Sequence, residues 1–360
     1  MRLPCGADSD CLSVDCGAVI RACPEEGGDA ADCASRARVH ILMKLSIVTS
    51  LYRSAPYIRE FQRRSLEAIR ASGASSYEII FVNDGSPDDS LAIAKSIAEG
   101  DANVTVIDLS RNFGQHRAIF AGLEQSTGDF IFVIDSDLEE DPEWLPLFLS
   151  ELQTRGGDVV YGYNTNIKRG YVYSLCRQIF YKTLNLLSSA EVPENVCNAR
   201  VMSRRYVNAL LQFREREIFM AGIWHMAGFE QHAVKVVKHD TSPTTYSFIK
   251  LGSMFINAIT AFSTRPLVAI SATGIGLSLV ACSYVAFIVY RKLIHGIAVE
   301  GWASVMAAVL MIGGISLFFN GIMAIYIAKI FIEVKQRPLA IVREIYSQSD
   351  STCSKERKAL

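Results

Sequence analysis

Two long uncharged runs near the end of the chain constrain its fold more than any other feature. Residues 267–290 and 302–328 contain no Asp, Glu, Lys or Arg. Each run is longer than the ~20 residues that an α-helix needs to cross the hydrocarbon core of a bilayer. Two buried helices of a large soluble core are the alternative, but such helices rarely stay uncharged over this length. The sequence therefore predicts two transmembrane helices joined as a hairpin.

Basic residues stand on both outer flanks of this hairpin: Lys250 and Arg265 before the first run, and Lys329, Lys335 and Arg337 after the second. Because Lys and Arg are in excess on the cytoplasmic side of membrane helices, both ends of the hairpin are expected in the cytosol. Arg291 and Lys292, in the short connection, favour the opposite orientation. Membrane lipid is thus an expected partner. The net charge of -1 gives no case for nucleic acid.

Residues 1–42 differ from the rest of the chain. Five of the nine cysteines lie in the first 33 residues, at gaps that match no zinc pattern. The segment also lacks the apolar core of a signal peptide. We expect a disordered leader or a misassigned start, because Met43 stands directly before the first strand-like run.

Residues 43–245 alternate between short apolar runs and helical patterns. Strands are predicted over 45–50, 78–83, 104–109, 130–134 and 158–161, and helices over 56–71, 90–99, 114–124 and 144–153. This alternation is typical of an α/β fold with a doubly wound, mostly parallel sheet. The glycine-rich turn of dinucleotide-binding domains is missing after the first strand, which argues against NAD or FAD.

Carboxylates follow two of the predicted strands. The run I-F-V-I-D-S-D (131–137) ends in Asp135 and Asp137, and Asp84 closes the second strand. In open α/β sheets, ligands bind beyond the carboxyl ends of the strands. Two hard oxygen donors there can hold Mg²⁺ or Mn²⁺, which in turn can hold a diphosphate. An acidic turn is the alternative for an isolated D-x-D. Asp84 could accept hydrogen bonds from a base or ribose.

The regions next to the hairpin have their own patterns. Residues 246–265 are amphipathic at helical spacing, which predicts an interfacial helix, with a core-packing helix as the alternative. Residues 331–360 are expected to form a cytosolic tail whose end is polar and aperiodic.

Several motifs together resemble the family 2 glycosyltransferases: V-N-D-G-S (82–86), S-R-N-F-G (110–114), D-S-D-L-E-E-D-P-E (135–143), F-S-T-R-P-L (262–267) and E-V-K-Q-R-P (333–338). Within that family the chain is most similar to the polyprenyl-phosphate branch, which includes dolichyl-phosphate mannosyltransferase and the bacterial undecaprenyl-phosphate glycosyltransferases. The resemblance covers roughly residues 44–345 and implies a GT-A-like fold followed by the membrane hairpin.

The resemblance also implies site residues. The nucleotide sugar would contact Thr49, Tyr52, Asp84, Arg111, Gly114 and Asp135. The catalytic pair would be Asp135 and Asp137, which would bind Mg²⁺ or Mn²⁺ together with Glu139. The acceptor phosphate would be held by Arg177, Arg200 and, as a weaker candidate, Arg169. Arginine suits that role because its planar fork binds phosphate oxygens in pairs.

Two positions depart from the family pattern. Asn198 stands where many relatives carry Asp, and Gly162-Tyr163-Asn164 replaces a Gly-x-Arg. An amide cannot take a proton, but a phosphomonoester is already largely ionised at neutral pH and needs no base. Asn198 is therefore compatible with transfer to a phosphate, or it marks altered acceptor positioning or lost activity.

The resemblance implies an inverting, metal-dependent transfer of a hexose from a UDP- or GDP-linked sugar to undecaprenyl or dolichyl phosphate. The reaction would occur at the cytosolic face of a membrane, expected to be a bacterial inner membrane, and would supply a lipid-linked sugar for envelope glycans. A catalytically silent membrane protein that binds sugar nucleotides is the alternative from another class. A processive polysaccharide synthase is a further one, although the chain lacks the Q-x-x-R-W motif. The two hydrophobic helices permit a homo-oligomer without requiring one.

Overall fold

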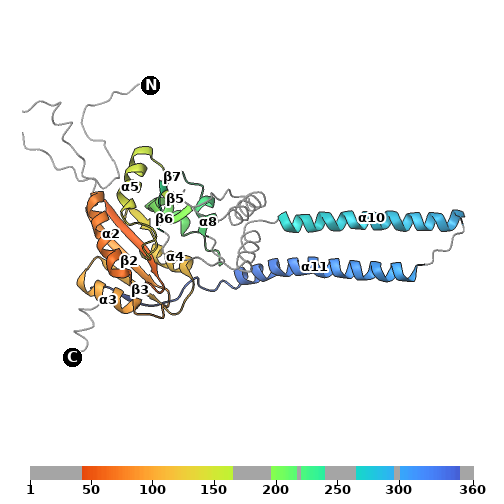
Figure 1. Cartoon of the computed structure of the whole chain (residues 1–360), viewed down its shortest axis with the longest axis horizontal. Helices are drawn as coiled ribbons and strands as arrows, with labels where there is room; N and C mark the ends of the chain where they lie inside the picture. Colours follow the sequence, from red (N-terminus) through yellow and green to blue (C-terminus); the bar gives the residue numbers. More distant parts are fainter. Residues whose placement is uncertain (1–42, 165–195, 217–219, 240–264, 296–300, 349–360) are drawn as a thin grey trace, which may run out of the picture.

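A mixed β-sheet at one end and a projecting pair of long helices make up the computed structural model of this protein (Figure 1). The structure describes residues 43–164, 196–216, 220–239, 265–295 and 301–348. The predicted leader (1–42) lies outside the described residues, as does the predicted interfacial helix, except for Arg265.

Four parallel strands form one half of the sheet, in the order β4-β1-β2-β3. They are β1 (Lys44–Leu51), β2 (Ser76–Asn83), β3 (Val104–Leu109) and β4 (Phe130–Val133). The connecting helices are α2 (Ile58–Ser72), α3 (Ser90–Gly100) and α4 (Gln115–Gln125). Nearly all the central residues of these strands are buried, which explains their continuous apolar sequences. The predicted α/β fold with a doubly wound sheet is confirmed.

The other half of the sheet contains antiparallel pairing that the sequence did not predict. It consists of β5 (Val159–Asn164), β6 (Val196–Ser203) and β7 (Gln231–Val236). Strand β6 runs antiparallel to both β4 and β5, whereas β5 and β7 are parallel. Strand β6 therefore joins the two halves of the sheet directly beside the strand that carries the D-x-D motif.

Helices cover both faces of the sheet. Helices α2, α3 and α5 (Trp144–Arg155) pack on one face, with Phe61 and Phe148 among their buried side chains. Helices α4, α7 (Arg204–Leu210) and α8 (Met220–Met226) pack on the other, where Tyr206 is fully buried. This three-layer arrangement leaves the carboxyl ends of β1, β2 and β4 as an edge where ligands can reach the sheet.

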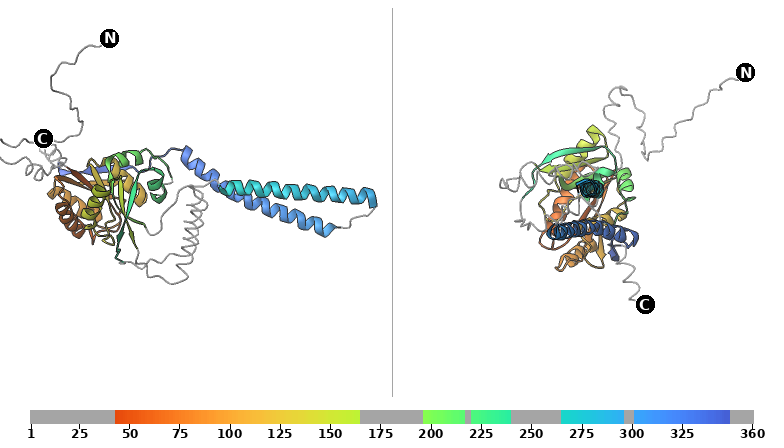
Figure 2. Two further views of the ribbon diagram at one scale, coloured as in Figure 1. Left: turned by 90° about the horizontal axis from the view of Figure 1, so that it is seen from above. Right: turned by 90° about the vertical axis from the view of Figure 1, so that its right-hand side faces the viewer.

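Helices α10 (Arg265–His295) and α11 (Trp302–Val334) run side by side away from the sheet (Figures 1 and 2). Their most apolar windows, Leu267–Tyr284 and Met311–Val334, are long and apolar enough to cross a membrane, and 0% of either window is buried. A large exposed apolar surface marks a site of contact with a membrane or with another protein. The hairpin thus has the length, composition and exposure expected of two membrane-crossing helices.

The chain returns to the sheet after α11. Residues Val342–Tyr346 form β8, which pairs antiparallel with β3 at the edge of the sheet. The predicted cytosolic tail (331–360) is therefore in part a strand of the globular domain. Strand β8 was not predicted from the sequence, because four of its five side chains are exposed and V-R-E-I-Y lacks the apolar pattern of a buried strand. The start of α10 and the end of α11 both lie at the end of the hairpin that is nearer the sheet (Figure 1).

Candidate active site

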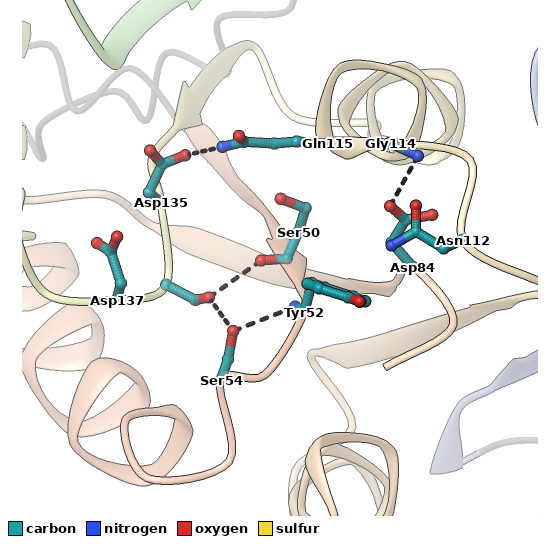
Figure 3. Close-up of a pocket in the computed structure, with 10 residues that line it drawn as sticks. Ser50, Tyr52, Ser54, Asp84, Asn112, Gly114, Gln115, Asp135 and Asp137 are labelled. Atoms are coloured by element: carbon teal, nitrogen blue, oxygen red, sulfur yellow. Dashed lines mark hydrogen bonds between the residues drawn. The ribbon is translucent and has the colours of Figure 1, made fainter. Parts of the chain in front are cut away.

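A polar pocket of about 270 Å³ lies at the carboxyl ends of β1, β2 and β4, beside the start of α4 (Figure 3). Its lining consists of Ser50, Tyr52, Ser54, Asp84, Asn112, Gly114, Gln115, Asp135, Ser136 and Asp137. Asp135 and Asp137 lie on one side of the pocket, and Asp84 and Asn112 lie on the other. Five predicted site residues are thus brought together: Tyr52, Asp84, Gly114, Asp135 and Asp137.

Asp135 and Asp137 follow the end of β4 and face the same pocket. Asp135 accepts hydrogen bonds from Gln115 Nε2 at 2.6 Å and from Asn198 Nδ2 at 2.8 Å. Burial raises the pKa of Asp135, and the nearby charge of Asp137 raises it further. Burial also raises the pKa of Asp137, to which the Glu139 charge contributes. The two carboxylates therefore lie where a cation would relieve an unfavourable concentration of negative charge.

A strained turn follows the D-x-D motif. Leu138 has a φ of 61°, a left-handed conformation that is unfavourable for a bulky side chain. This turn lets the Glu139 N–H donate to Asp137 Oδ1 at 3.0 Å. The Glu139 carboxylate forms an ion pair with Lys238 at 3.1 Å. Among the described residues, no group of three His, Cys, Asp or Glu side chains is arranged to hold a metal ion, so the predicted third ligand does not complete a set.

Glu140, which was not predicted as a site residue, links the acidic loop to β6. Its side chain is fully buried and accepts the N–H groups of Asn198 and Ala199 at 3.0 and 2.8 Å. Burial and the charge of Asp135 raise its pKa to about 7. Lys238 Nζ lies 3.7 Å from Oε1 and balances part of this charge. These bonds hold Asn198 against Asp135.

The opposite side of the pocket is built from the turn after β2 and the loop of residues 110–114. The Asp84 carboxylate accepts the N–H of Phe113 at 2.6 Å and that of Gly114 at 2.9 Å. Gly85 has a φ of 60°, and a Cβ atom on it would lie 2.5 Å from Asn112 N. Turn and loop are therefore in close backbone contact, which only glycine at position 85 permits.

Serine side chains form the floor of the pocket. Ser136 Oγ donates to Ser50 O at 3.0 Å and contacts Ser54 Oγ at 2.9 Å, and Ser54 Oγ accepts the Tyr52 N–H at 3.2 Å (Figure 3). Five lining residues were not predicted from the sequence: Ser50, Ser54, Asn112, Gln115 and Ser136. Of these, Asn112 and Ser136 lie inside the quoted motifs, which was the available signal.

Two residues predicted to contact the donor do not line this pocket. Thr49 is buried within β1, and its hydroxyl has no hydrogen-bond partner. The Arg111 guanidinium lies over the Phe113 ring, 4.2 Å from its centroid. Neighbouring side chains on a strand point to opposite faces, which is why Ser50 lines the pocket and Thr49 does not.

Arg200, predicted to hold the acceptor phosphate, lies in the core. It is only 1% exposed, and its guanidinium packs on the Trp224 ring while donating to the carbonyls of Cys197 and Asn198. Burial lowers its pKa to about 9. In this position Arg200 supports β6 through bonds to its backbone and does not line the pocket. Arg169 and Arg177, predicted for the same role, lie outside the described residues.

Comparisons with known proteins agree on one family. Residues 46–211 match the family described as "Glycosyl transferase family 2". A protein of Mycobacterium tuberculosis (strain CDC 1551 / Oshkosh), named as a glycosyltransferase, is 40% identical over 86% of this chain and 90% of its own length. The "Prophage bactoprenol glucosyl transferase homolog" of Escherichia coli (strain K12) is 32% identical over 84% of this chain and 99% of its own.

A phage protein and one solved structure extend these comparisons. The "Bactoprenol glucosyl transferase" of Shigella phage SfII is 31% identical over 84% of this chain and 98% of its own. The structure of glucosyl-3-phosphoglycerate synthase from Mycobacterium tuberculosis with Mn²⁺ and UDP-glucose has a TM-score of 0.41 and 20% identity, over 66% of this chain and 83% of that chain. A likeness at that level carries no information about the ligands of this chain.

Proposed function

The chain belongs to the family 2 glycosyltransferases, and on that premise we propose that it transfers a hexose from a nucleotide sugar to a polyprenyl phosphate at a membrane surface. The glycosyltransferase activity follows from the family. The hexose, the acceptor, the inverting course and the metal are parts of the proposal.

The observation that carries the proposal is the shared pocket of Asp135, Asp137 and Asp84. The carboxylates of Asp135 and Asp137 suit the diphosphate end of a nucleotide sugar when a cation lies between them. On the other side, Asp84, Asn112 and the loop backbone offer polar groups suited to a nucleoside. A UDP- or GDP-linked hexose would then have its anomeric carbon near the D-x-D side.

The relatives and the membrane hairpin both support a polyprenyl phosphate as the acceptor. Bactoprenol glucosyl transferases align with this chain over nearly their whole length. The hairpin would hold the pocket close to the bilayer, where a polyprenyl phosphate is confined. The basic residues on its outer flanks support a cytosolic catalytic domain, and the bacterial and phage relatives support an inner-membrane setting.

The side chains of Asp135 and Asp137 suit a divalent cation. Asp135 and Asp137 are hard oxygen ligands whose pKa values are raised by burial, and a bound cation would stabilise their ionised forms. Mg²⁺ and Mn²⁺ accept such ligands and take further oxygens from phosphates or water. When bound there, the ion would supply positive charge toward the leaving diphosphate.

The proposed reaction requires no side chain that acts as a base. A phosphate oxygen of the acceptor forms a bond to the anomeric carbon from the face opposite the nucleotide. The bond from that carbon to the diphosphate oxygen breaks, and the nucleoside diphosphate leaves with the electron pair. Asn198 donates a hydrogen bond to Asp135 at 2.8 Å and therefore orients that carboxylate. Its amide cannot act as a base. Positioning and charge stabilisation would supply most of the rate enhancement.

A transfer assay tests this proposal. Membranes that contain the chain from Met43 onward would be offered labelled UDP- and GDP-hexoses with undecaprenyl phosphate and Mg²⁺ or Mn²⁺. We expect label in the lipid extract, lost on chelation and in Asp137→Asn. Glu67→Gln, which changes an exposed carboxylate on α2 in the same way, is the matched control and should retain full activity. Donor binding without transfer, over the whole donor panel, would contradict the proposal.

A further inference from the structure

We propose that Arg343, on the strand that follows the membrane hairpin, is a positioning residue for the nucleotide side of the pocket. The inference rests on the proposed function, because it assigns Arg343 to the binding of that donor. Arg343 does not line the pocket. It would act through the loop of residues 110–114, here called the donor loop.

Arg343 is the extra residue of a bulge in β8, because Asp108 pairs with Glu344 and the next residue, Leu109, pairs with Val342. Its Nη1 lies 3.2 Å from Asp108 Oδ2, and its Nη2 donates to Ser110 O at 2.6 Å. The register between β3 and β8 shifts between Asp108 and Leu109, so the ladder alone does not hold the end of β3 in place. The Ser110 N–H also donates to Ile341 O at 2.9 Å. Strand β8 and the residue before it therefore fix the first residue of the donor loop.

The contacts continue from Asp108 to the pocket. Asp108 Oδ1 accepts Asn83 Nδ2 at 2.7 Å, and the next residue, Asp84, accepts the N–H groups of Phe113 and Gly114. The donor loop is thus held at its start by Arg343 and at its end by Asp84. Asn112, between these two attachments, lines the pocket.

The Asp108–Arg343 contact joins a buried carboxylate to an exposed arginine. The Asp108 side chain is 2% exposed, whereas that of Arg343 is 57% exposed. An ion pair open to solvent on one side adds little to global stability. Removing the cationic partner of a buried carboxylate leaves an uncompensated charge, so the surrounding groups must rearrange. A shift of the Asp108 side chain would disturb its bond to Asn83 and the end of β3, where the donor loop begins.

Strand β8 adds little to the hydrophobic core. Four of its five side chains are exposed and only Tyr346 packs partly against the core, while Arg343 adds polar contacts to the backbone pairing with β3. Lys95 Nζ lies 3.8 Å from the centroid of the Tyr346 ring and holds the far end of the strand. Loss of the Arg343 side chain should therefore disturb the donor loop more than the fold as a whole.

The test compares Arg343→Gln with Arg205→Gln in the full chain, purified in detergent. Arg205 is a matched control: its side chain is 72% exposed and contacts Asp158, which is 4% exposed, on the other half of the sheet. We expect Arg343→Gln to raise the donor KM about tenfold while kcat changes by less than about twofold. Arg205→Gln should leave both constants unchanged.

Hydrogen exchange measured by mass spectrometry provides a readout independent of turnover. Arg343→Gln should speed amide exchange in residues 110–114, whereas Arg205→Gln should not. Arg343→Lys keeps the charge without the fork and should restore part of the donor affinity. It also keeps the test decisive if Arg343→Gln folds poorly.

Three results would overturn the inference: an unchanged donor KM in Arg343→Gln, an equal rise in Arg205→Gln, or unchanged hydrogen exchange in the donor loop of Arg343→Gln. Failure of the proposed function would look different, because the unmodified protein would then transfer no sugar, while exchange in residues 110–114 would still report on Arg343.

Discussion

The two sides of the pocket use the same residue type in opposite ways. On the β2–β3 side, Asp84 and Asp108 bind backbone amides, Asn83 and Arg343, and these bonds build the wall of the pocket. After β4, Asp135 and Asp137 lie in an acidic loop where burial raises the pKa of both. The first side stabilises the fold, whereas the second concentrates charge and thereby lowers stability. Such a concentration of carboxylates with raised pKa values is typical of a functional site.

Asp137→Asn should have the largest effect and sharpen this comparison. It removes one of the two carboxylates that we propose as cation ligands, so we expect transfer to fall about 10³-fold. The thermal unfolding midpoint should stay the same or rise, because a buried carboxylate with a raised pKa is replaced by a neutral amide. Transfer and thermal unfolding would be measured on the same preparation. A clear loss of stability would mean that Asp137 is a structural residue like Asp84.

Gly85→Ala should have the next largest effect, on the opposite side of the pocket. The new Cβ would lie 2.5 Å from Asn112 N and 2.6 Å from Arg111 C, so the donor loop must move. Donor affinity, measured by titration calorimetry, should fall about 10- to 100-fold if the strain is about 1–3 kcal/mol. Gly73→Ala is the control, since Gly73 has a φ of 73° and a Cβ added there would meet nothing within 4 Å. Equal losses in both variants would assign the effect to backbone strain alone.

Asp84→Asn should mainly reduce stability. An amide can accept only one of the two N–H groups that the carboxylate now accepts, and its NH₂ would face the other. We expect the free energy of unfolding to fall by about 1–3 kcal/mol in chemical denaturation. Asp89→Asn, at an exposed carboxylate without a capping hydrogen bond, should be neutral. If Asp84→Asn were as stable as the unmodified protein, the contrast between the two sides would fail.

The pH dependence of cation binding should show the smallest effect. Because the pKa values of Asp135 and Asp137 are raised, these groups take up protons at a higher pH than ordinary aspartates. A cation must displace those protons, so Mn²⁺ affinity should fall as the pH is lowered, by at most about tenfold per pH unit for each proton displaced. Calorimetric titrations with Mn²⁺ between about pH 5 and about pH 7.5 would measure this slope. A flat profile would show that the carboxylates are already ionised at the lower pH.

Strands with covered faces were predictable, whereas strands at edges and junctions were not. The apolar runs of β1 to β4 can be recognised as strands in the sequence, because both faces of these strands are buried. Strand β6 carries Asn198 and Arg200 between apolar residues, and β8 is mostly exposed, so neither follows a simple pattern. Both strands owe their place to antiparallel pairing with β4 and β3, partners far away in the chain.

The candidate site shows the same division. Asp84, Asp135 and Asp137 were predictable because strand ends in α/β sheets meet at one edge. Gln115 and Ser54 were not, because their approach to the acidic loop depends on how the loops after β1 and β3 turn. Arg200 was misplaced because a sequence motif does not show whether an arginine faces a pocket or the core.

The sequence alone determined the α/β alternation, the two membrane-type helices and the acidic motif, since each depends on residues close together in the chain. The tertiary structure decided that β8 returns across the hairpin to β3, that Glu140 holds Asn198 against Asp135, and that Arg343 contacts the donor loop. These arrangements join residues that are far apart in the chain. The periodicity of a short segment does not indicate such partners, because the burial and pairing of the whole sheet determine them.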